Sequence, residues 1–342
     1  MACPQKYKSM QSFYKYYSGE KVAPVMTIFV GGNHEAANHL WELPYGGWVA
    51  ENIFYLGYAG VVNFGGLRIG GISGIYNEHH YHQGHYETPP FNDKTQRSAY
   101  HIREYEVFQL LQLRQNLDVF LSHDWPRGIA HHGNKEKLLR KKSFLREEVN
   151  NYSLGSPPGE NILMTVRPKF WFSAHLHVKF AALVKHTNTD PSQKDRPTET
   201  RFLALDKCLP NREFLQVLDF PTDGTVPNEI HVDEEWMAIL RSTQSFRSDT
   251  RSQRLPKANN NNNRSDFSAT PAELMQVQEK IKTLGTSAWP SKFVITSEVC
   301  RRSDVSDLRF LRPRKIQSLI FTSSDLSVLT YLRPQIHFFS FF

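Results

Sequence analysis

Cysteine is scarce in this sequence: Cys3, Cys208 and Cys300 are the only three among 342 residues, and they lie far apart. Three distant cysteines cannot form the disulfide framework of a small secreted protein. Paired cysteines are also common ligands of structural zinc ions, so the lack of such pairs argues against a structural zinc site. The cysteine content therefore favours a reducing, intracellular compartment.

Long apolar runs are also missing. The apolar stretch 316–332 is interrupted by Ser318, Thr322 and Asp325, whereas a membrane helix needs roughly 18 uninterrupted apolar residues. Residues 1–8 contain no apolar segment of the kind found in secretory signal peptides. The sequence therefore predicts no membrane span and no secretory signal. Its 39% hydrophobic residues suffice for one sizeable core and a smaller domain.

Positive charge is in excess, with a formal net charge of +7. This balance favours a polyanionic partner such as nucleic acid, and a well-solvated basic surface is the alternative. The clearest concentration is the segment 135–146, where six lysines and arginines surround Leu138 and Leu139. A solvated helix face is the common meaning of such a segment, and contact with phosphates is the more specific one.

Three apolar runs, residues 28–30, 119–121 and 170–172, each lead into histidine. The polar residues that follow them are Asn33, His34, His123, His175 and His177. In α/β proteins, ligands bind in the crevice beyond the carboxyl ends of parallel strands, where distant parts of the chain meet. The sequence therefore predicts an α/β fold with one site built from these five residues.

These side chains have the chemistry of a metal site. His175 and His177 are two positions apart, and in extended backbone such residues point to the same side. Neutral imidazoles and an amide oxygen suit divalent Fe, Zn or Mn. The alternative is a set of unrelated core histidines, which becomes less plausible with each further histidine at a strand end.

The segment from Tyr76 to Tyr100 is polar and aromatic, without usable periodicity. Its candidate substrate-binding residues are Tyr81, His85, Tyr86 and Arg97. Aromatic and imidazole faces beside arginine are suited to holding unstacked nucleotides. Long loops in compact domains are usually functional, and a merely flexible insertion is the alternative.

The same residues resemble the motifs of a known family. Gly-Gly-Asn33-His34-Glu, Ser-His123-Asp-Trp-Pro and Ala-His175-Leu-His177 are similar to the later signature motifs of the calcineurin-like metallophosphoesterases. The flanking residues, together with 43–48 and 202–210, are closer still to the RNA lariat debranching enzymes, and the likeness covers roughly residues 6–241. The resemblance implies a two-sheet β-sandwich flanked by helices, followed by a small C-terminal domain.

The resemblance also implies an activity: metal-dependent hydrolysis of the 2′–5′ phosphodiester at the branch point of excised intron lariat RNA, in the nucleus. By the same resemblance, Asn33, His123 and His175 bind one metal and His177 binds a second. His34 is the implied general acid that protonates the leaving 2′-oxygen. The segment 76–100 corresponds to the family's lariat-recognition loop.

The sequence departs from the family pattern before Asn33. The opening motifs, Asp- or Cys-x-His and Gly-Asp, do not occur in residues 1–32, and no histidine precedes His34. The missing Asp would bridge both metals, so the second metal keeps only His177. We therefore expect the core to be N-terminally truncated, with Met1 an internal methionine of a longer protein. Two alternatives to debranching stay open: a catalytically inactive fragment that binds branched RNA, and a phosphoesterase with another substrate.

Changes in composition divide the chain. The order expected is an incomplete metallophosphoesterase core (1–183), a linker (184–198), the family's C-terminal domain (199–241), a disordered Asn-rich segment (242–273), and a helix with a tail unlike the family (274–342). The linker is rich in Thr, Asp, Pro, Gln and Lys, and five consecutive asparagines occupy 259–263.

Overall fold

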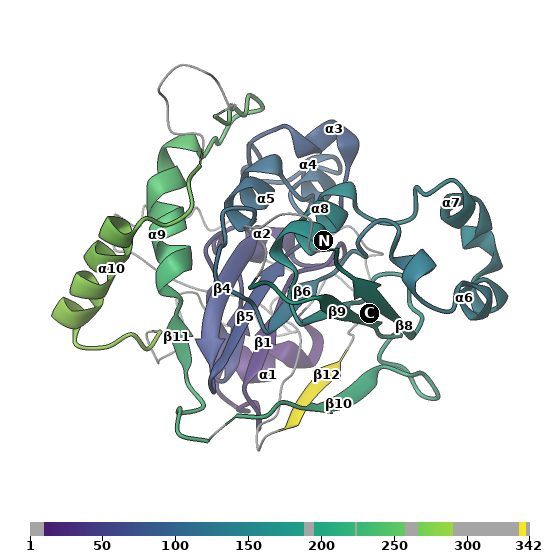
Figure 1. Cartoon of the computed structure of the whole chain (residues 1–342), viewed down its shortest axis with the longest axis horizontal. Helices are drawn as coiled ribbons and strands as arrows, with labels where there is room; N and C mark the ends of the chain where they lie inside the picture. The colour runs from purple at the N-terminus through teal and green to yellow at the C-terminus, as the bar shows by residue number, and fades with distance from the viewer. Residues whose placement is uncertain (1–9, 188–194, 223, 257–265, 290–334, 340–342) are drawn as a thin grey trace, which may run out of the picture.

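Two β-sheets form the centre of the computed structural model, which describes residues 10–187, 195–222, 224–256, 266–289 and the backbone of 335–339 (Figure 1). The strand order is β11-β4-β5-β6-β7-β9-β8 in the larger sheet and β1-β3-β2 in the smaller, and β10 pairs with β12 separately. The strands are β1 (Thr27–Phe29), β2 (Gly47–Ala50), β3 (Ile53–Tyr55), β4 (Ala59–Phe64), β5 (Leu67–Ile72), β6 (Val119–Ser122), β7 (Phe170–Ser173), β8 (Phe180–Lys185), β9 (Glu199–Ala204), β10 (Leu215–Asp219), β11 (Ile230–Val232) and β12 (Gln335–Phe339).

Helices surround the sheets. They are α1 (Tyr14–Tyr17), α2 (Ala37–Leu40), α3 (Glu78–Tyr81), α4 (Thr95–Ser98), α5 (Glu104–Leu110), α6 (Lys135–Lys141), α7 (Arg146–Asn150), α8 (Pro157–Val166), α9 (Glu234–Thr243) and α10 (Pro271–Leu284). Figure 1 shows α9 and α10 at one end of the molecule and α6 and α7 at the other. In the part of the chain that is described, no helix has the length and apolar character needed to cross a membrane.

The centre of the larger sheet is parallel. Strands β5, β6, β7 and β9 run in one direction, with Ile72 opposite Ser122 and Leu121 opposite Phe172. Parallel strands in register end at the same edge of a sheet. Residues that follow β5, β6 and β7 therefore meet at one edge, although they are far apart in the sequence.

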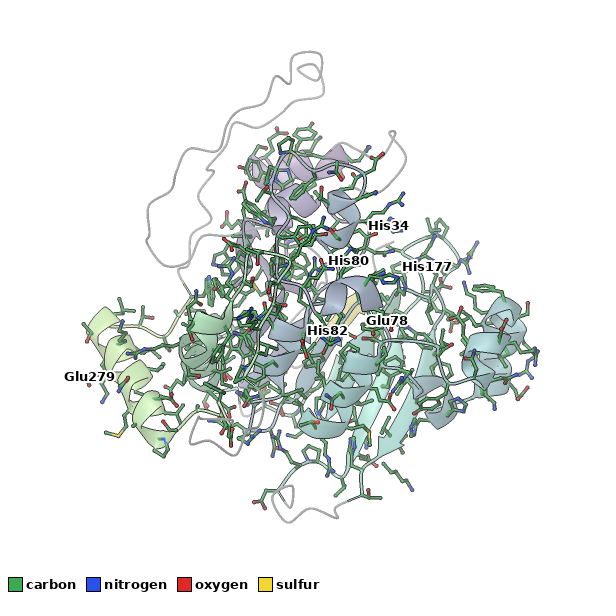
Figure 2. The ribbon with its side chains drawn as sticks, turned by 90° about the horizontal axis from the view of Figure 1, so that it is seen from above. His34, Glu78, His80, His82, His177 and Glu279 are labelled. Carbon is green, nitrogen blue, oxygen red and sulfur yellow. The ribbon has the colours of Figure 1, made fainter. Side chains whose placement is uncertain are left out.

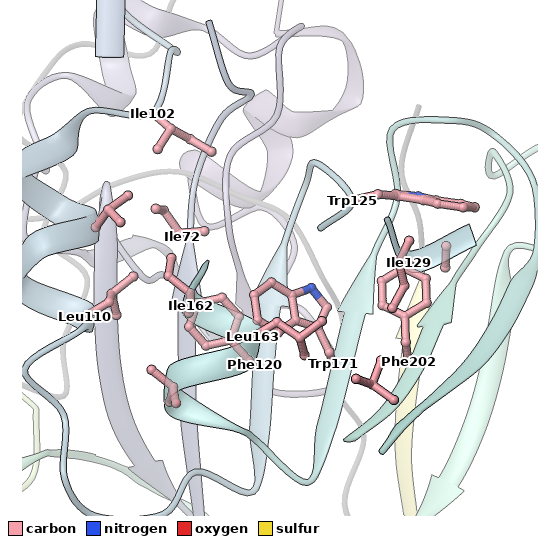
Figure 3. Close-up of a cluster of buried hydrophobic side chains, with 14 of the residues drawn as sticks. Ile72, Ile102, Leu110, Phe120, Trp125, Ile129, Ile162, Leu163, Trp171 and Phe202 are labelled. Atoms are coloured by element: carbon pink, nitrogen blue, oxygen red, sulfur yellow. The ribbon is translucent and has the colours of Figure 1, made fainter. Parts of the chain in front are cut away.

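The two faces of the larger sheet bury different cores because successive side chains of a strand point to opposite sides. Phe120 belongs to the cluster that packs against α5, α8 and α9, together with Trp171 (Figure 3). Val119 and Leu121 instead pack toward the smaller sheet, where they meet residues such as Phe54. The expected α/β fold, a two-sheet sandwich flanked by helices, is confirmed.

The segment 76–100, expected to be irregular, contains two short helices, α3 and α4. The Asn77 side chain caps α3 by accepting from the His80 N–H at 3.2 Å. The division into domains stays a prediction: β8 and β9 pair within the same sheet, on either side of the expected linker. Part of that linker, the asparagine run and most of the tail lie outside the described residues.

Candidate active site

Strands β6 and β7 bring two histidines to the same sheet edge. His123 directly follows β6, and His175 lies two residues beyond the end of β7. The two strand ends are joined by a 2.8 Å hydrogen bond between the hydroxyls of Ser122 and Ser173. The Ala174 N–H also donates to the His123 carbonyl at 3.2 Å. The parallel register and these bonds fix the backbone of both histidines.

The third segment comes from the smaller sheet, because β1 pairs with β3 and not with the parallel strands of the larger sheet. The sequence did not predict that β1 would lie in a different sheet. Two hydrogen bonds connect it to the end of β5: the Gly31 N–H donates to the Ser73 hydroxyl at 3.0 Å, and the Gly74 N–H donates to the Gly31 carbonyl at 2.8 Å. Asn33 therefore reaches the edge where His123 lies.

Gly32 is required by the close approach of His123. A Cβ atom at position 32 would lie 2.7 Å from Cε1 and 2.8 Å from Nδ1 of that imidazole, closer than real contacts allow. The Glu35 carboxylate completes the turn by accepting from the Gly32 N–H at 3.2 Å, and burial raises the pKa of Glu35 to about 7. The backbone of residues 31–32 thus leaves space for one particular ring.

Three donor groups meet around His123. Its Nε2 lies 3.0 Å from Asn33 Oδ1 and 3.2 Å from His175 Nδ1. Adjacent ligands of an ion held at about 2.1 Å are themselves about 3.0–3.4 Å apart, for octahedral or tetrahedral angles. The observed separations therefore match those of ligands that share one metal ion. Among the described residues, no group of three or more His, Cys, Asp or Glu side chains forms such a site, and this cluster instead combines two imidazoles with an amide.

His123 is held in its neutral form. Burial lowers its pKa well below the usual value, and the charges of His175, His34 and His177 lower it further. A neutral imidazole is the form that binds a metal, since protonation blocks the lone pair. The environment therefore favours ligation at near-neutral pH.

Asp124 lies beside the cluster and was not predicted as a site residue from the sequence. Its half-buried carboxylate directly follows His123 and accepts from the N–H groups of Tyr76 at 3.1 Å and Trp125 at 3.0 Å. Burial raises the pKa of Asp124, and the nearby His175 opposes this rise. Its position next to His123 in the sequence could have marked Asp124 as a candidate. Asp124 ties the start of the segment 76–100 to the cluster.

His175 and His177 are not in extended backbone, so the expectation that they lie on one face of a strand was wrong. Both have left-handed φ values, 56° and 51° respectively. Such a conformation costs a non-glycine residue roughly 1–2 kcal/mol. Burial lowers the pKa of His177 to about 4, and the charges of Lys207 and Lys142 add to the effect. Two strained residues at one strand end are typical of a functional site.

His34 is exposed at the same edge. Its charge lowers the pKa of His123, as that of His177 does, so both lie within electrostatic range of that half-buried imidazole. Figure 2 labels His34 and His177, which come from different parts of the chain. An exposed imidazole next to a cluster of donors can exchange protons with a substrate and with water. Its position suits the acid role expected from the sequence.

The four loop residues expected to bind substrate have different surroundings. Tyr81 ends α3 and packs on the core, whereas Arg97 in α4 is exposed. His85 is buried, with its ring stacked on Tyr58 at 4.1 Å and its Nε2 3.0 Å from Glu106. The Tyr86 ring lies 4.6 Å from the guanidinium of Arg251. The structure thus gives His85 and Tyr86 protein partners, and substrate binding by these four residues stays a prediction.

Beneath the loop is a cavity of about 30 Å³ that reaches Gly31 and Gly32. Its lining includes Glu106 and Arg103, and the buried guanidinium of Arg103 is paired with Glu87. No sequence signal marked these buried charges, because pairing of Arg103 with Glu87 depends on how the loop folds back. They anchor the segment 76–100 beside the histidine cluster.

The chain is similar in sequence to a group of known proteins. The family model "Lariat debranching enzyme, C-terminal domain" matches residues 197–317. The chain is 55% identical to the lariat debranching enzyme of Gallus gallus and 56% identical to that of Homo sapiens, in each case over 82% of this chain and 52% of the relative. It is 47% identical to the lariat debranching enzyme of Drosophila melanogaster, over 93% of this chain and 66% of the relative. The chain spans about half the length of the vertebrate relatives it matches.

Proposed function

Because this chain belongs to the lariat debranching enzyme family, we propose that it hydrolyses the 2′–5′ phosphodiester of branched RNA at the cluster of Asn33, His123 and His175. The natural substrate in this proposal is the excised intron lariat, and the location is the nucleus. The similarity to lariat debranching enzymes indicates the reaction class. The positions of the side chains supply the roles of individual residues.

The observation that supports the proposal most directly is the meeting of three donor atoms from β1, β6 and β7. Oδ1 of Asn33 and Nδ1 of His175 both approach Nε2 of His123, at 3.0 and 3.2 Å. Two imidazoles and an amide oxygen suit divalent Fe, Zn or Mn. These three residues would hold one ion, and His177 is the candidate ligand of a second.

A divalent ion, when bound, supplies Lewis acidity for the phosphate ester and for the attacking water. The chain's own residues orient the substrate and move the proton. His34 lies at the exposed rim of the cluster and would donate its proton to the leaving 2′-oxygen. Lys142 and Lys207 lie close enough to lower the pKa of His177, and their positive charges attract the phosphate.

The test is cleavage of a synthetic branched RNA by the purified 342-residue chain with added Mn²⁺. The expected product pattern is loss of the 2′–5′ branch with the 3′–5′ linkages left intact. His34→Ala should lower turnover about 10²–10⁴-fold, the usual contribution of a general acid. His175→Ala should remove activity and bound metal together. Cleavage of 3′–5′ linkages at a similar rate would contradict the proposal.

The alternative of an RNA-binding chain without catalysis has its own signature in the same experiment. Tight binding of the branched RNA with no hydrolysis under any metal would support it. One feature of the sequence favours this alternative: residues 1–32 contain no carboxylate motif that could bind a second metal. Activity of the wild-type chain above that of His175→Ala would dismiss it.

A further inference from the structure

Phe144 is exposed on a basic lobe, the segment 135–146, which consists of α6, Lys142, the 3-10 helix Ser143–Leu145 and Arg146. The lobe carries six lysines and arginines and one carboxylate, Glu136. Figure 1 shows α6 beyond β8, at the opposite end of the molecule from α10. The Phe144 side chain is 74% exposed.

The packing of the lobe does not require Phe144. The other apolar residues of the lobe, Leu138, Leu139 and Leu145, are buried and join the main core. Because the Phe144 ring is largely in solvent, it contributes little buried apolar area to the stability of the fold. The basic residues around it disfavour association with another apolar surface. The ring is therefore available to an anionic partner that carries flat apolar groups.

Lys142 lies next to Phe144, with its Nζ 5.9 Å from the centre of the ring. The lobe is tied to the strand ends through Glu213, the partner of Lys141, whose carbonyl accepts from the Asp206 N–H at 3.1 Å. The preceding Leu205 N–H donates to the carbonyl of Ser173, two residues before His175, at 3.1 Å. Lys141 is paired with Glu213 at 2.9 Å, whereas Lys142 forms no ion pair within the described residues. The ammonium group of Lys142 is thus free to contact a phosphate between the cluster and the ring.

We propose that Phe144 is a stacking platform for a base in one single-stranded arm of the RNA, and that Lys142 contacts the phosphate leading from the cluster to that base. Single-stranded RNA fits this surface because it combines a phosphate backbone with unpaired bases, each of which has a face that can stack on an aromatic ring. The inference rests on the proposed function for the identity of the ligand. The stack on Phe144 is a second contact with the RNA, outside the reacting centre. It requires an RNA arm long enough to reach from the cluster to this ring.

The test measures binding in EDTA, so that hydrolysis plays no part. Branched RNAs with 2-aminopurine at successive positions of each arm are titrated with the full chain, and fluorescence reports stacking. One position should be quenched by the wild type and by Phe144→Trp, and not by Phe144→Ala. Affinity for the long-armed RNA should fall roughly five- to 150-fold in Phe144→Ala, the range for one lost base stack.

Residues of α10 provide matched controls at the far end of the molecule. Leu284, 76% exposed, allows the same loss of an exposed apolar side chain, so Leu284→Ala should bind RNA as the wild type does. Lys142→Ala should weaken binding and reduce the salt dependence by about one phosphate contact, a change of about 0.7 in slope for single strands. Lys280→Ala removes the same charge from exposed α10 and should leave the slope unchanged.

The outcomes separate this inference from the proposed function. Position-specific quenching that needs an aromatic residue at 144 supports the platform, even if the chain hydrolyses no RNA. Hydrolysis of the 2′–5′ bond with no quenched position overturns the platform and leaves the proposed function standing. Equal affinities of Phe144→Ala and wild type for the long-armed RNA would also overturn it.

Discussion

Nε2 of His123 and Nδ1 of His175 lie 3.2 Å apart, although 52 residues separate them in the chain. The parallel pairing of β6 with β7 sets the distance between their strand ends, and the left-handed backbone at His175 turns the chain there. Two imidazole nitrogens this close cannot both carry a proton without strong repulsion. The arrangement is therefore suited to sharing a proton or a metal ion.

The first prediction concerns Gly32→Ala. The added methyl would meet the His123 ring at 2.7 Å and displace it from Asn33 and His175. We expect metal affinity to fall at least about tenfold, comparable with changes to groups that orient metal ligands. Isothermal titration with Zn²⁺ measures the affinity, and thermal unfolding checks that the variant folds.

Gly31→Ala is the matched control for Gly32→Ala. A Cβ at position 31 would lie 2.9 Å from Cδ1 of Leu40, the far end of a flexible side chain that can move. Gly31→Ala should therefore lower metal affinity much less than Gly32→Ala. If both alanine variants bind Zn²⁺ equally well, the close approach of His123 does not determine the site.

The second prediction concerns the buried clamp that holds the start of α9 to the core. Arg68 donates to Asp233 at 2.7 Å and to Glu235 at 2.8 Å, and all three side chains are buried. Arg68→Ala leaves two carboxylates without their cation, so we expect a loss of about 3–5 kcal/mol in the free energy of unfolding. Urea denaturation provides this value.

An exposed ion pair provides the comparison for Arg68. Arg201 lies 3.2 Å from Glu199 at the surface, where water screens the interaction. Arg201→Ala should cost less than about 1 kcal/mol. Similar losses in the two variants would show that the clamp contributes no more than a surface pair.

The third prediction is a pH dependence of stability through His186. Its Nε2 pairs with the Thr200 hydroxyl at 2.8 Å, and burial lowers its pKa from 6.5 to about 4. Because the unfolded chain binds the proton more readily, this contribution is complete above pH about 6.5 and is lost as pH falls toward about 4. His186→Gln should flatten the fall in unfolding free energy over that window.

Other buried histidines titrate in the same window, so the informative quantity is the difference between variant and wild type. His79 is exposed in α3, and His79→Gln should reproduce the wild-type pH profile. An unchanged slope in His186→Gln would mean that the buried imidazole does not control acid stability.

The sequence predicted the gathering of the strand-end residues because apolar runs that end on histidine are local patterns. It could not predict that β1 joins the smaller sheet, since that depends on pairing with residues 53–55 and on the Ser73 hydroxyl. It also misjudged the backbone of His175 and His177, because the strand stops at Ser173. The buried pair of Arg103 and Glu87 depends on the folded loop and left no periodic signal.

Titration of the purified chain with Mn²⁺ or Zn²⁺ is the most direct test of the central claim, that Asn33, His123 and His175 form one metal site. We expect one ion per chain, because three candidate ligands serve one site and His177 alone serves the other. His123→Ala should abolish this binding, and His34→Ala should retain it, which separates the ligands from the acid. Two tightly bound ions per chain, or unchanged binding by His123→Ala, would show that these three residues do not form a single metal site.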